Sequence, residues 1–178
     1  MQFAMALRII GVLLVVFSTA MLPSLLMSLL EKDGLEDAFA RGFFLTFVAG
    51  IVIWLPTRHQ NKDLNIRDGF LVTAMFWIVL GLFGSIPLFL SDILDLSISD
   101  AVFESISGLT TTGATVLTGL DHLPNSILFY RQLLQWLGGI GIIVLAVAIL
   151  PMLGIGGMQL YRAESSGPSK DRKLAPRI

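Results

Sequence analysis

Four apolar stretches dominate the sequence, and each is close to the length that a helix needs to cross a lipid bilayer. They cover residues 7–30, 38–55, 69–90 and 126–150. A bilayer core of about 30 Å requires roughly 20 apolar residues, because backbone groups that face lipid must be hydrogen-bonded within the helix. Only 14% of the residues are charged, against roughly a quarter in an average soluble domain. The sequence therefore predicts an all-α membrane protein.

The first apolar stretch is too long for a secretory signal. A signal peptide has an apolar region of about 7 to 15 residues followed by a cleavage site of small residues. Here Arg8 is the only charge within residues 7–30, and no such cleavage pattern follows. We therefore expect a retained transmembrane helix, which forms a leading pair with the span at 38–55 in residues 1–68.

The placement of lysine and arginine predicts the orientation in the membrane. Residues 56–68 hold three basic residues and the tail after Tyr161 holds five, whereas residues 91–130 hold none and carry five acidic residues. Short loops rich in lysine and arginine stay in the cytoplasm. Both termini are therefore expected in the cytoplasm, with the acidic loops outside.

A helix between the last two spans is too short to cross the membrane. Ser97 and Asp100 resemble a capping box, which predicts a helix over 98–109. A helix of this length reaches only about 18 Å. The polar return through Gly119 to Pro124 predicts that the chain enters and leaves this region on the outer side.

The short helix leads into Thr110, Thr111, Thr112, Gly113 and Ala114. Non-helical backbone at membrane depth is tolerated only where protein buries it or where it lines a watery cavity. A dehydrated potassium ion needs several weakly held oxygen ligands, which the carbonyl groups of extended threonines supply. Gly113 can adopt backbone angles that let successive carbonyls point the same way. The negative end of the helix dipole also favours a cation.

Two acidic residues and one basic residue have alternative interpretations. Glu104 and Asp100 either draw cations toward the loop or are simply what the positive-inside bias leaves outside. Arg131, at the outer start of the last span, either holds the loop by pairing with an acid such as Glu104 or extends to the lipid head groups. Gly138 and Gly139 permit close helix packing or a hinge.

The residues alone leave the function open. A Thr-Thr-Thr-Gly sequence is by itself more often a turn than an ion filter. The loop is then a buried connection in a non-conducting membrane anchor or accessory subunit, or part of a pore for another monovalent cation such as ammonium. The sequence has no cysteine, no cluster of His, Asp and Glu with metal-ligand spacing and no nucleophile with a plausible base, so we do not expect an enzyme. The net charge of −1 gives no indication of nucleic-acid binding.

Three long motifs resemble the Trk/Ktr family of potassium-uptake proteins. They are RDGFLVTAMFWIVLGLFGSIP, DAVFESISGLTTTGATV and LFYRQLLQWLGGIGIIVLAVAILPMLGIGGMQLYRAE, and the resemblance covers the whole chain. It implies two leading transmembrane helices followed by units of helix, pore loop and helix, repeated four times in a potassium-channel-like fold. Residues 69–150 then form the first unit, and 151–178 a cytoplasmic tail that links to the next. The family's chains are more than twice as long, so a truncated portion is expected.

The resemblance also implies roles for residues and partners. Thr111 and Thr112 would coordinate potassium, flanked by Thr110 and the filter glycine Gly113. Ala114 stands where tetrameric channels have tyrosine, which predicts a broader selectivity that admits rubidium and some sodium. The implied function is potassium uptake across the bacterial inner membrane, with potassium as the transported ion and no covalent cofactor. The implied partners are membrane lipid, a TrkA-like cytoplasmic nucleotide-binding ring, and a second copy in the dimer of the full-length family.

Overall fold

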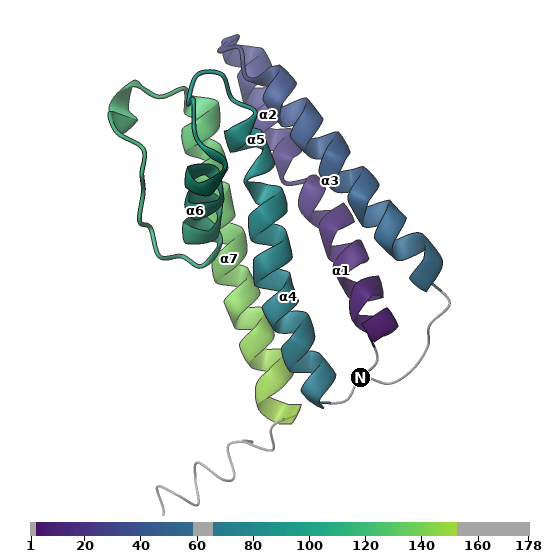
Figure 1. Ribbon diagram of the computed structural model, residues 1–178. Helices are drawn as coiled ribbons and strands as arrows, with labels where there is room; N and C mark the ends of the chain where they lie inside the picture. Colours follow the sequence, from purple (N-terminus) through teal and green to yellow (C-terminus); the bar gives the residue numbers. More distant parts are fainter. Residues whose placement is uncertain (1–2, 59–65, 153–178) are drawn as a thin grey trace, which may run out of the picture.

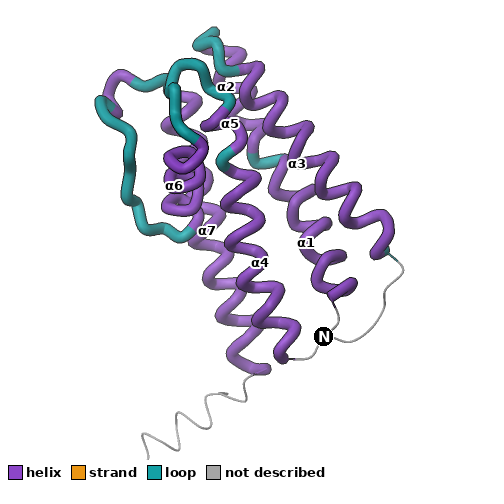
Figure 2. The backbone as a smooth tube through the Cα atoms, viewed as in Figure 1, coloured by secondary structure: helices purple, strands orange, loops and turns teal. Residues whose placement is uncertain are grey.

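The computed structural model describes residues 3–58 and 66–152, and these ranges are helical apart from their turns (Figure 1, Figure 2). The elements in chain order are α1 Phe3–Ser18, α2 Met21–Glu31, α3 Glu36–Thr57, α4 Ile66–Gly84, α5 Ile86–Phe89, α6 Ile98–Leu109, the short 3-10 turn η1 Leu120–His122, and α7 Asn125–Met152. Neither described range contains a strand. The predicted all-α fold class is confirmed. The tail expected at 151–178 lies outside the described residues from residue 153 onward.

Three helical stretches of the described chain are long and apolar enough to cross a membrane. They are Ala4–Glu31, Glu36–Thr57 and Val72–Phe89. Apolar side chains such as Val16, Val52 and Leu82 are exposed on these helices, as expected for surfaces that face lipid. The chain is therefore a multi-pass membrane protein. The fourth expected span, 126–150, falls in α7, whose side chains beyond residue 143 are outside the described part, and it stays a prediction.

The first expected span, 7–30, keeps its length but is not one uninterrupted helix. A proline has no N–H group, and its ring displaces the carbonyl four residues earlier. Pro23 therefore breaks the helix at Thr19, where the N–H group of Leu22 donates to the Thr19 carbonyl at 3.1 Å in a tighter turn. The hydroxyl groups of Ser18 and Thr19 each donate to a carbonyl one turn earlier, at 2.7 and 2.6 Å, a pattern that bends helices. The break separates α1 from α2.

A second proline divides the expected span at 69–90. Helix α4 ends at Gly84, and the short helix α5 follows with Pro87 in its first turn. The Gly84 carbonyl accepts a hydrogen bond from the Tyr130 hydroxyl at 2.8 Å, which ties the end of α4 to α7. The buried ring of Tyr130 meets Phe39 of α3 edge-on, with 5.4 Å between the ring centroids. The end of α4 is thus held by the Tyr130 hydroxyl of α7, and Phe39 of α3 packs against the ring that carries this hydroxyl.

Glycines allow α1 and α3 to approach each other closely. A Cβ atom on Gly11 would lie 2.8 Å from the backbone nitrogen of Trp54, and one on Gly50 would lie 2.8 Å from that of Val15. Small residues let helix backbones pack closely in membranes, where van der Waals contact is a main source of association energy. Close backbone packing at Gly11 and Gly50 therefore holds α1 and α3 of the leading pair together.

Helix α6 packs against both α4 and α7. On the α4 side, a Cβ atom on Gly81 would lie 2.6 Å from a side-chain carbon of Ile106, and one on Gly84 would lie 2.6 Å from the hydroxyl oxygen of Ser105. The chain enters α6 and leaves the following loop at the same end of the bundle, so the far end of α6 and the start of the loop lie partway along α7 (Figure 1).

Candidate functional site

Backbone N–H groups tie the threonine loop to the last turn of α6. The N–H group of Thr111 donates to the Gly108 carbonyl at 2.9 Å. Those of Thr112 and Gly113 both donate to the Ser107 carbonyl, at 3.0 and 3.4 Å. The last carbonyls of a helix have no partner within the helix. The loop therefore supplies partners for these carbonyls and is anchored by them.

This bonding determines where the loop carbonyls point. The N–H and C=O groups of a planar trans peptide point in opposite directions, and no described peptide bond is cis. The N–H groups of Thr111, Thr112 and Gly113 face α6, so the carbonyl of the residue before each of them faces away from α6. The loop therefore presents a row of three carbonyl oxygens, from Thr110, Thr111 and Thr112, on the side opposite α6. We call these three groups the carbonyl row.

The backbone angles of the loop alternate in sign. Thr110 has φ −79°, Thr111 has φ 56° and Gly113 has φ 74°, while Thr112 is not among the described residues with positive φ. Alternation of this kind aligns successive peptide groups. The special backbone angle predicted for Gly113 is confirmed. The positive φ of Thr111 was not predicted, and it is an outlier for a β-branched residue, of the kind that costs about 1–3 kcal/mol and persists only when the surroundings impose it.

Hydroxyl groups brace the loop from within. The Thr110 hydroxyl donates to the Ile106 carbonyl at 2.8 Å and lies 2.8 Å from the hydroxyl oxygen of Thr112. The Ser107 hydroxyl donates to the Ala114 carbonyl at 2.6 Å. The Ala114 carbonyl therefore faces α6, unlike those of the carbonyl row, and the row ends before it.

Helix α7 supports the loop through side chains three or four residues apart, which share one helix face. A Cβ atom on Gly108 would lie 3.1 Å from the Cβ of Leu134, and one on Gly113 would lie 3.7 Å from the side-chain nitrogen of Gln135. A Cβ atom on Gly138 would collide with the backbone carbonyl of Leu109. Close packing, one of the two interpretations of Gly138, is therefore confirmed.

A buried carboxylate holds the segment that follows the threonines. Glu104 of α6 accepts hydrogen bonds from the Thr115 hydroxyl, at 2.9 and 3.0 Å, and from the Val116 N–H group at 3.0 Å. Arg131 of α7 reaches the same carboxylate, with Nε at 2.7 Å and a terminal nitrogen at 2.6 Å. The Glu104 side chain is 1% exposed. Pairing with Glu104, one of the two interpretations of Arg131, is confirmed.

Glu104 therefore does not present a free surface charge that draws cations, because it is buried and paired. Asp100 has the capping role that the sequence predicts. Its N–H group donates to the Ser97 hydroxyl oxygen at 3.2 Å, and its carboxylate accepts from that hydroxyl at 2.6 Å. The start of α6 is thus fixed by its own sequence.

A second polar cluster joins the turn between α2 and α3 to the start of α7. Asp33 accepts hydrogen bonds from the hydroxyls of Ser28 and Ser126, both at 2.5 Å, and from the N–H group of Leu35 at 3.2 Å. Burial acts to raise the pKa of Asp33, but the bonds from Ser126, Ser28 and nearby N–H groups together outweigh it and lower the pKa below its ordinary value. A negative charge is also favourable at a helix N-terminus.

Glu31 extends this cluster, since its carboxylate accepts from the side-chain amide of Asn125 at 3.0 and 3.1 Å. The sequence indicates only an acidic outer loop here. The partners lie more than 90 residues apart along the chain, and no local pattern identifies them.

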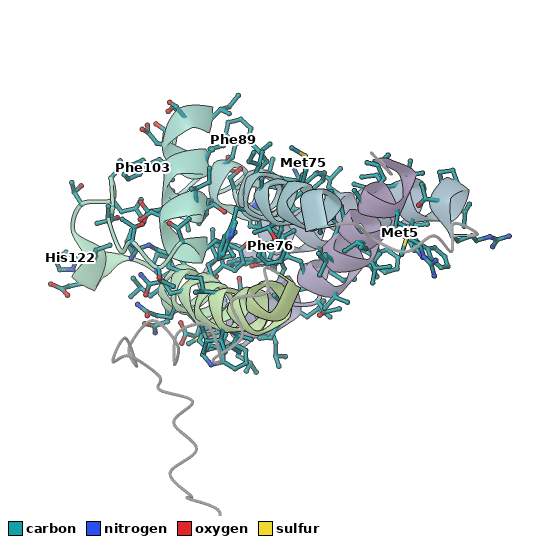
Figure 3. All side chains as sticks on the ribbon, turned by 90° about the horizontal axis from the view of Figure 1, so that it is seen from below. Met5, Met75, Phe76, Phe89, Phe103 and His122 are labelled. Atoms are coloured by element: carbon teal, nitrogen blue, oxygen red, sulfur yellow. The ribbon has the colours of Figure 1, made fainter. Side chains whose placement is uncertain are left out.

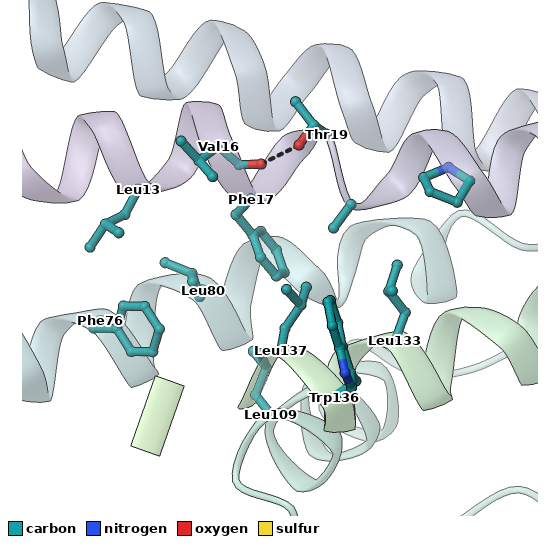
Figure 4. A pocket seen from close by; sticks show the side chains of 12 residues that line it. Leu13, Val16, Phe17, Thr19, Phe76, Leu80, Leu109, Leu133, Trp136 and Leu137 are labelled. Carbon is teal, nitrogen blue, oxygen red and sulfur yellow. Dashed lines mark hydrogen bonds between the residues drawn. The ribbon is translucent and has the colours of Figure 1, made fainter. Parts of the chain in front are cut away.

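An apolar cavity of about 340 Å³ lies between the break in the first span, α4 and α7 (Figure 4). Phe17, Leu80 and Trp136 are among its lining residues. Its one hydroxyl, on Thr19, donates to the Val16 carbonyl. The lining is therefore almost entirely apolar and carries no charged side chain, which is unlike a site for a cation.

His122 belongs to the short turn η1, which precedes α7. Viewed along the helices, His122 lies at the edge of the loop, away from the bundle (Figure 3). Among the described residues, no group of three His, Cys, Asp or Glu side chains is arranged to hold a metal ion. The threonine segment therefore offers a cation backbone carbonyl oxygens and hydroxyl oxygens.

Comparison with known proteins gives consistent matches. Residues 35–178 match the TrkH family, described as a cation transport protein. The Trk system potassium uptake proteins TrkH of Halomonas elongata and of Vibrio parahaemolyticus are 61% and 57% identical to this chain over all 178 residues, which are 37% of each relative. The crystal structure of the potassium transporter TrkH from Vibrio parahaemolyticus matches with a TM-score of 0.80 and 53% identity, over 92% of this chain and 35% of that one. The chain thus spans about 37% of the length of these curated relatives.

Proposed function

Because the chain belongs to the TrkH family of cation transport proteins, we propose that it forms the first pore unit of a potassium-uptake protein. Relatives that match it over its full length are named for potassium uptake. The relatives are transporters, and no reaction is proposed for the described residues. Potassium is the proposed cargo rather than a resident cofactor.

The observation that carries this proposal is the carbonyl row of Thr110, Thr111 and Thr112. Carbonyl oxygens that point away from their supporting helix can replace water around a dehydrated cation. The C-terminal end of α6 lies directly behind them, and its dipole favours positive charge. We assign Thr111 and Thr112 as potassium ligands, with Thr110 contributing a third oxygen and Gly113 permitting the turn of the backbone.

A single carbonyl row covers only part of an ion, so the remaining ligands must come from further units. The relatives are long enough to contain such units, since this chain matches 37% of their length. We propose that residues 69–150 are the first unit, placed after a leading pair in residues 1–68 and linked onward through 151–178. We further propose a bacterial inner-membrane location with both termini in the cytoplasm, a TrkA-like cytoplasmic partner, contact with membrane lipid, and a dimer of the complete protein.

A chimera tests the proposal, in which this chain replaces the matching 178 residues of the Vibrio parahaemolyticus relative. Cells that cannot import potassium are expected to take up rubidium when they express it. Serine at position 113 must adopt a left-handed angle at a penalty of about 1–2 kcal/mol, so Gly113→Ser should lower the preference for potassium over sodium about tenfold. Unchanged selectivity in this variant would show that the loop is not the filter. If the unmodified chimera is inserted but carries no rubidium, this segment acts as a non-conducting anchor.

A further inference from the structure

The Glu104 carboxylate contacts three separate parts of the pore unit. It projects from α6, accepts from Thr115 and Val116 of the return segment, and is paired with Arg131 of α7. Buried carboxylates persist where a charge partner and hydrogen-bond donors surround them. Glu104 has both, and residues 110–116 are all exposed while it is buried. The carboxylate therefore bonds to the loop on the buried side that faces α6.

The loop is anchored at both ends on the same helix. At its start, the N–H groups of Thr112 and Gly113 are held by the Ser107 carbonyl. At its end, Thr115 and Val116 are held by Glu104, which lies one turn earlier on α6. The carbonyl row lies between these two anchors. Release of the second anchor would let the end of the loop move relative to the first.

We propose that Glu104 and Arg131, with Thr115 as their contact in the loop, form a positioning cluster that sets the cation selectivity of the carbonyl row. The inference rests on the proposed function and deepens it. Glu104 and Arg131 act through the backbone of the return segment and do not touch the ion. Their opposite charges largely cancel, so their effect comes from geometry rather than from attraction of cations.

Conservative variants of the same chimera test this role. Glu104→Gln keeps the shape but weakens the bonds to Thr115 and Val116. Thr115→Val removes the hydroxyl that donates to Glu104 and accepts from the Leu117 N–H group. The change lies on the exposed loop and leaves the helices untouched, so the variant is expected to fold. We expect the preference for rubidium over sodium to fall about tenfold in Glu104→Gln and about threefold in Thr115→Val, since charge-assisted bonds are roughly twice as strong as neutral ones. Rubidium uptake is normalised to the amount of protein in the membrane.

A charge swap separates positioning from simple pairing. The double variant Glu104→Arg with Arg131→Glu keeps an ion pair but leaves the Val116 N–H group without its acceptor. We expect its selectivity to stay at or below that of Glu104→Gln, and full recovery by the swap would overturn the proposal. If the swapped chain does not reach the membrane, Thr115→Val decides the matter, because an unchanged rubidium preference in it also overturns the proposal.

The exposed ion pair of α3 provides the matched control. Asp37 and Arg41 pair one turn apart, with side chains 66% and 62% exposed. Asp37→Asn and Arg41→Gln change the same charges outside the pore unit and should leave selectivity unaltered. If the unmodified chimera carries no rubidium, both the proposed function and this inference are wrong. If the chimera is selective and neither Glu104→Gln nor Thr115→Val changes its selectivity, only the inference is wrong.

Discussion

The leading pair and the loop region hold their backbones in place by different means. In the leading pair, α1 and α3 meet at Gly11 and Gly50, where backbone lies directly against backbone. In the loop region, the non-helical segment is held by directional bonds to Ser107 and Glu104. Helices satisfy their own polar groups, whereas a non-helical segment must find hydrogen-bond partners elsewhere. Polar side chains are therefore concentrated where the helix is interrupted.

Two ion pairs, one in each region, show the same contrast. Asp37 and Arg41 lie on one exposed helix face, where such pairs contribute about 0–1 kcal/mol. Glu104 and Arg131 join two helices and are 1% and 14% exposed. Removal of one partner of a buried pair leaves a charge without compensation. Removal of the arginine of each pair should therefore lower the free energy of unfolding much more for the buried pair than for the exposed pair.

The largest effect is expected from Arg131→Met. This change leaves the buried Glu104 carboxylate unpaired and should lower the free energy of unfolding by about 3–5 kcal/mol. Thermal unfolding of the purified chimera measures the change. Arg41→Met is the matched control, with an expected loss of less than about 1 kcal/mol. Equal losses of unfolding free energy in the two variants would contradict the stated difference between the buried and the exposed ion pair.

A somewhat smaller effect is expected from Gly138→Ala. Its Cβ atom would collide with the Leu109 backbone carbonyl, and overpacking of this kind costs typically about 1–3 kcal/mol. Because the collision moves the end of α6, rubidium uptake should fall along with the unfolding temperature. At neighbouring Gly139 the nearest atom, a methyl carbon of Thr111, would lie 4.0 Å from a Cβ atom. Gly139→Ala should therefore behave like the unmodified chimera, and a comparable loss there would contradict the packing described.

The smallest effect is expected at Asp33, which connects the two regions. Asp33→Ala should lower the free energy of unfolding by about 1 kcal/mol, since water can replace part of its bonds. Its pKa is lowered in the folded protein from 3.8, so its stabilising contribution is present above pH 3.8 and is lost as the pH falls through the lower folded value. The difference between the unfolding temperatures of the two proteins should therefore be constant well above pH 3.8 and should shrink as the pH is lowered below 3.8. A difference that does not shrink below pH 3.8 would mean that the charge of Asp33 is not involved.

Much of the fold follows from local patterns in the sequence. Hydropathy indicates the long helices, and Ser97 with Asp100 indicates the start of α6. The breaks at Pro23 and Pro87 were missed because hydropathy is averaged over a window, in which one proline changes little. Proline lacks an N–H group and disturbs the preceding helical turn. The positions of Pro23 and Pro87 in the sequence are therefore enough to predict both breaks.

The site was predictable only in part. The Thr-Thr-Thr-Gly segment identified the loop, and the charges of Glu104 and Arg131 suggested their pairing. The positive φ of Thr111 could not be predicted, because threonine disfavours that angle and only the bonds to α6 impose it. The bond between Asp33 and Ser126 joins residues 93 positions apart. Such contacts depend on the completed fold.

The orientation of the carbonyl row has a consequence for how this region can evolve. The N–H groups of Thr111, Thr112 and Gly113 are bonded to carbonyls of Gly108 and Ser107, and all these groups belong to the main chain. The side chains at 111 and 112 can therefore differ between related proteins while the oxygens keep their direction. Proline is the exception, because it would delete the N–H group itself. The main-chain hydrogen bonds therefore restrict which residues this loop can accept more strictly than the chemistry of the side chains does.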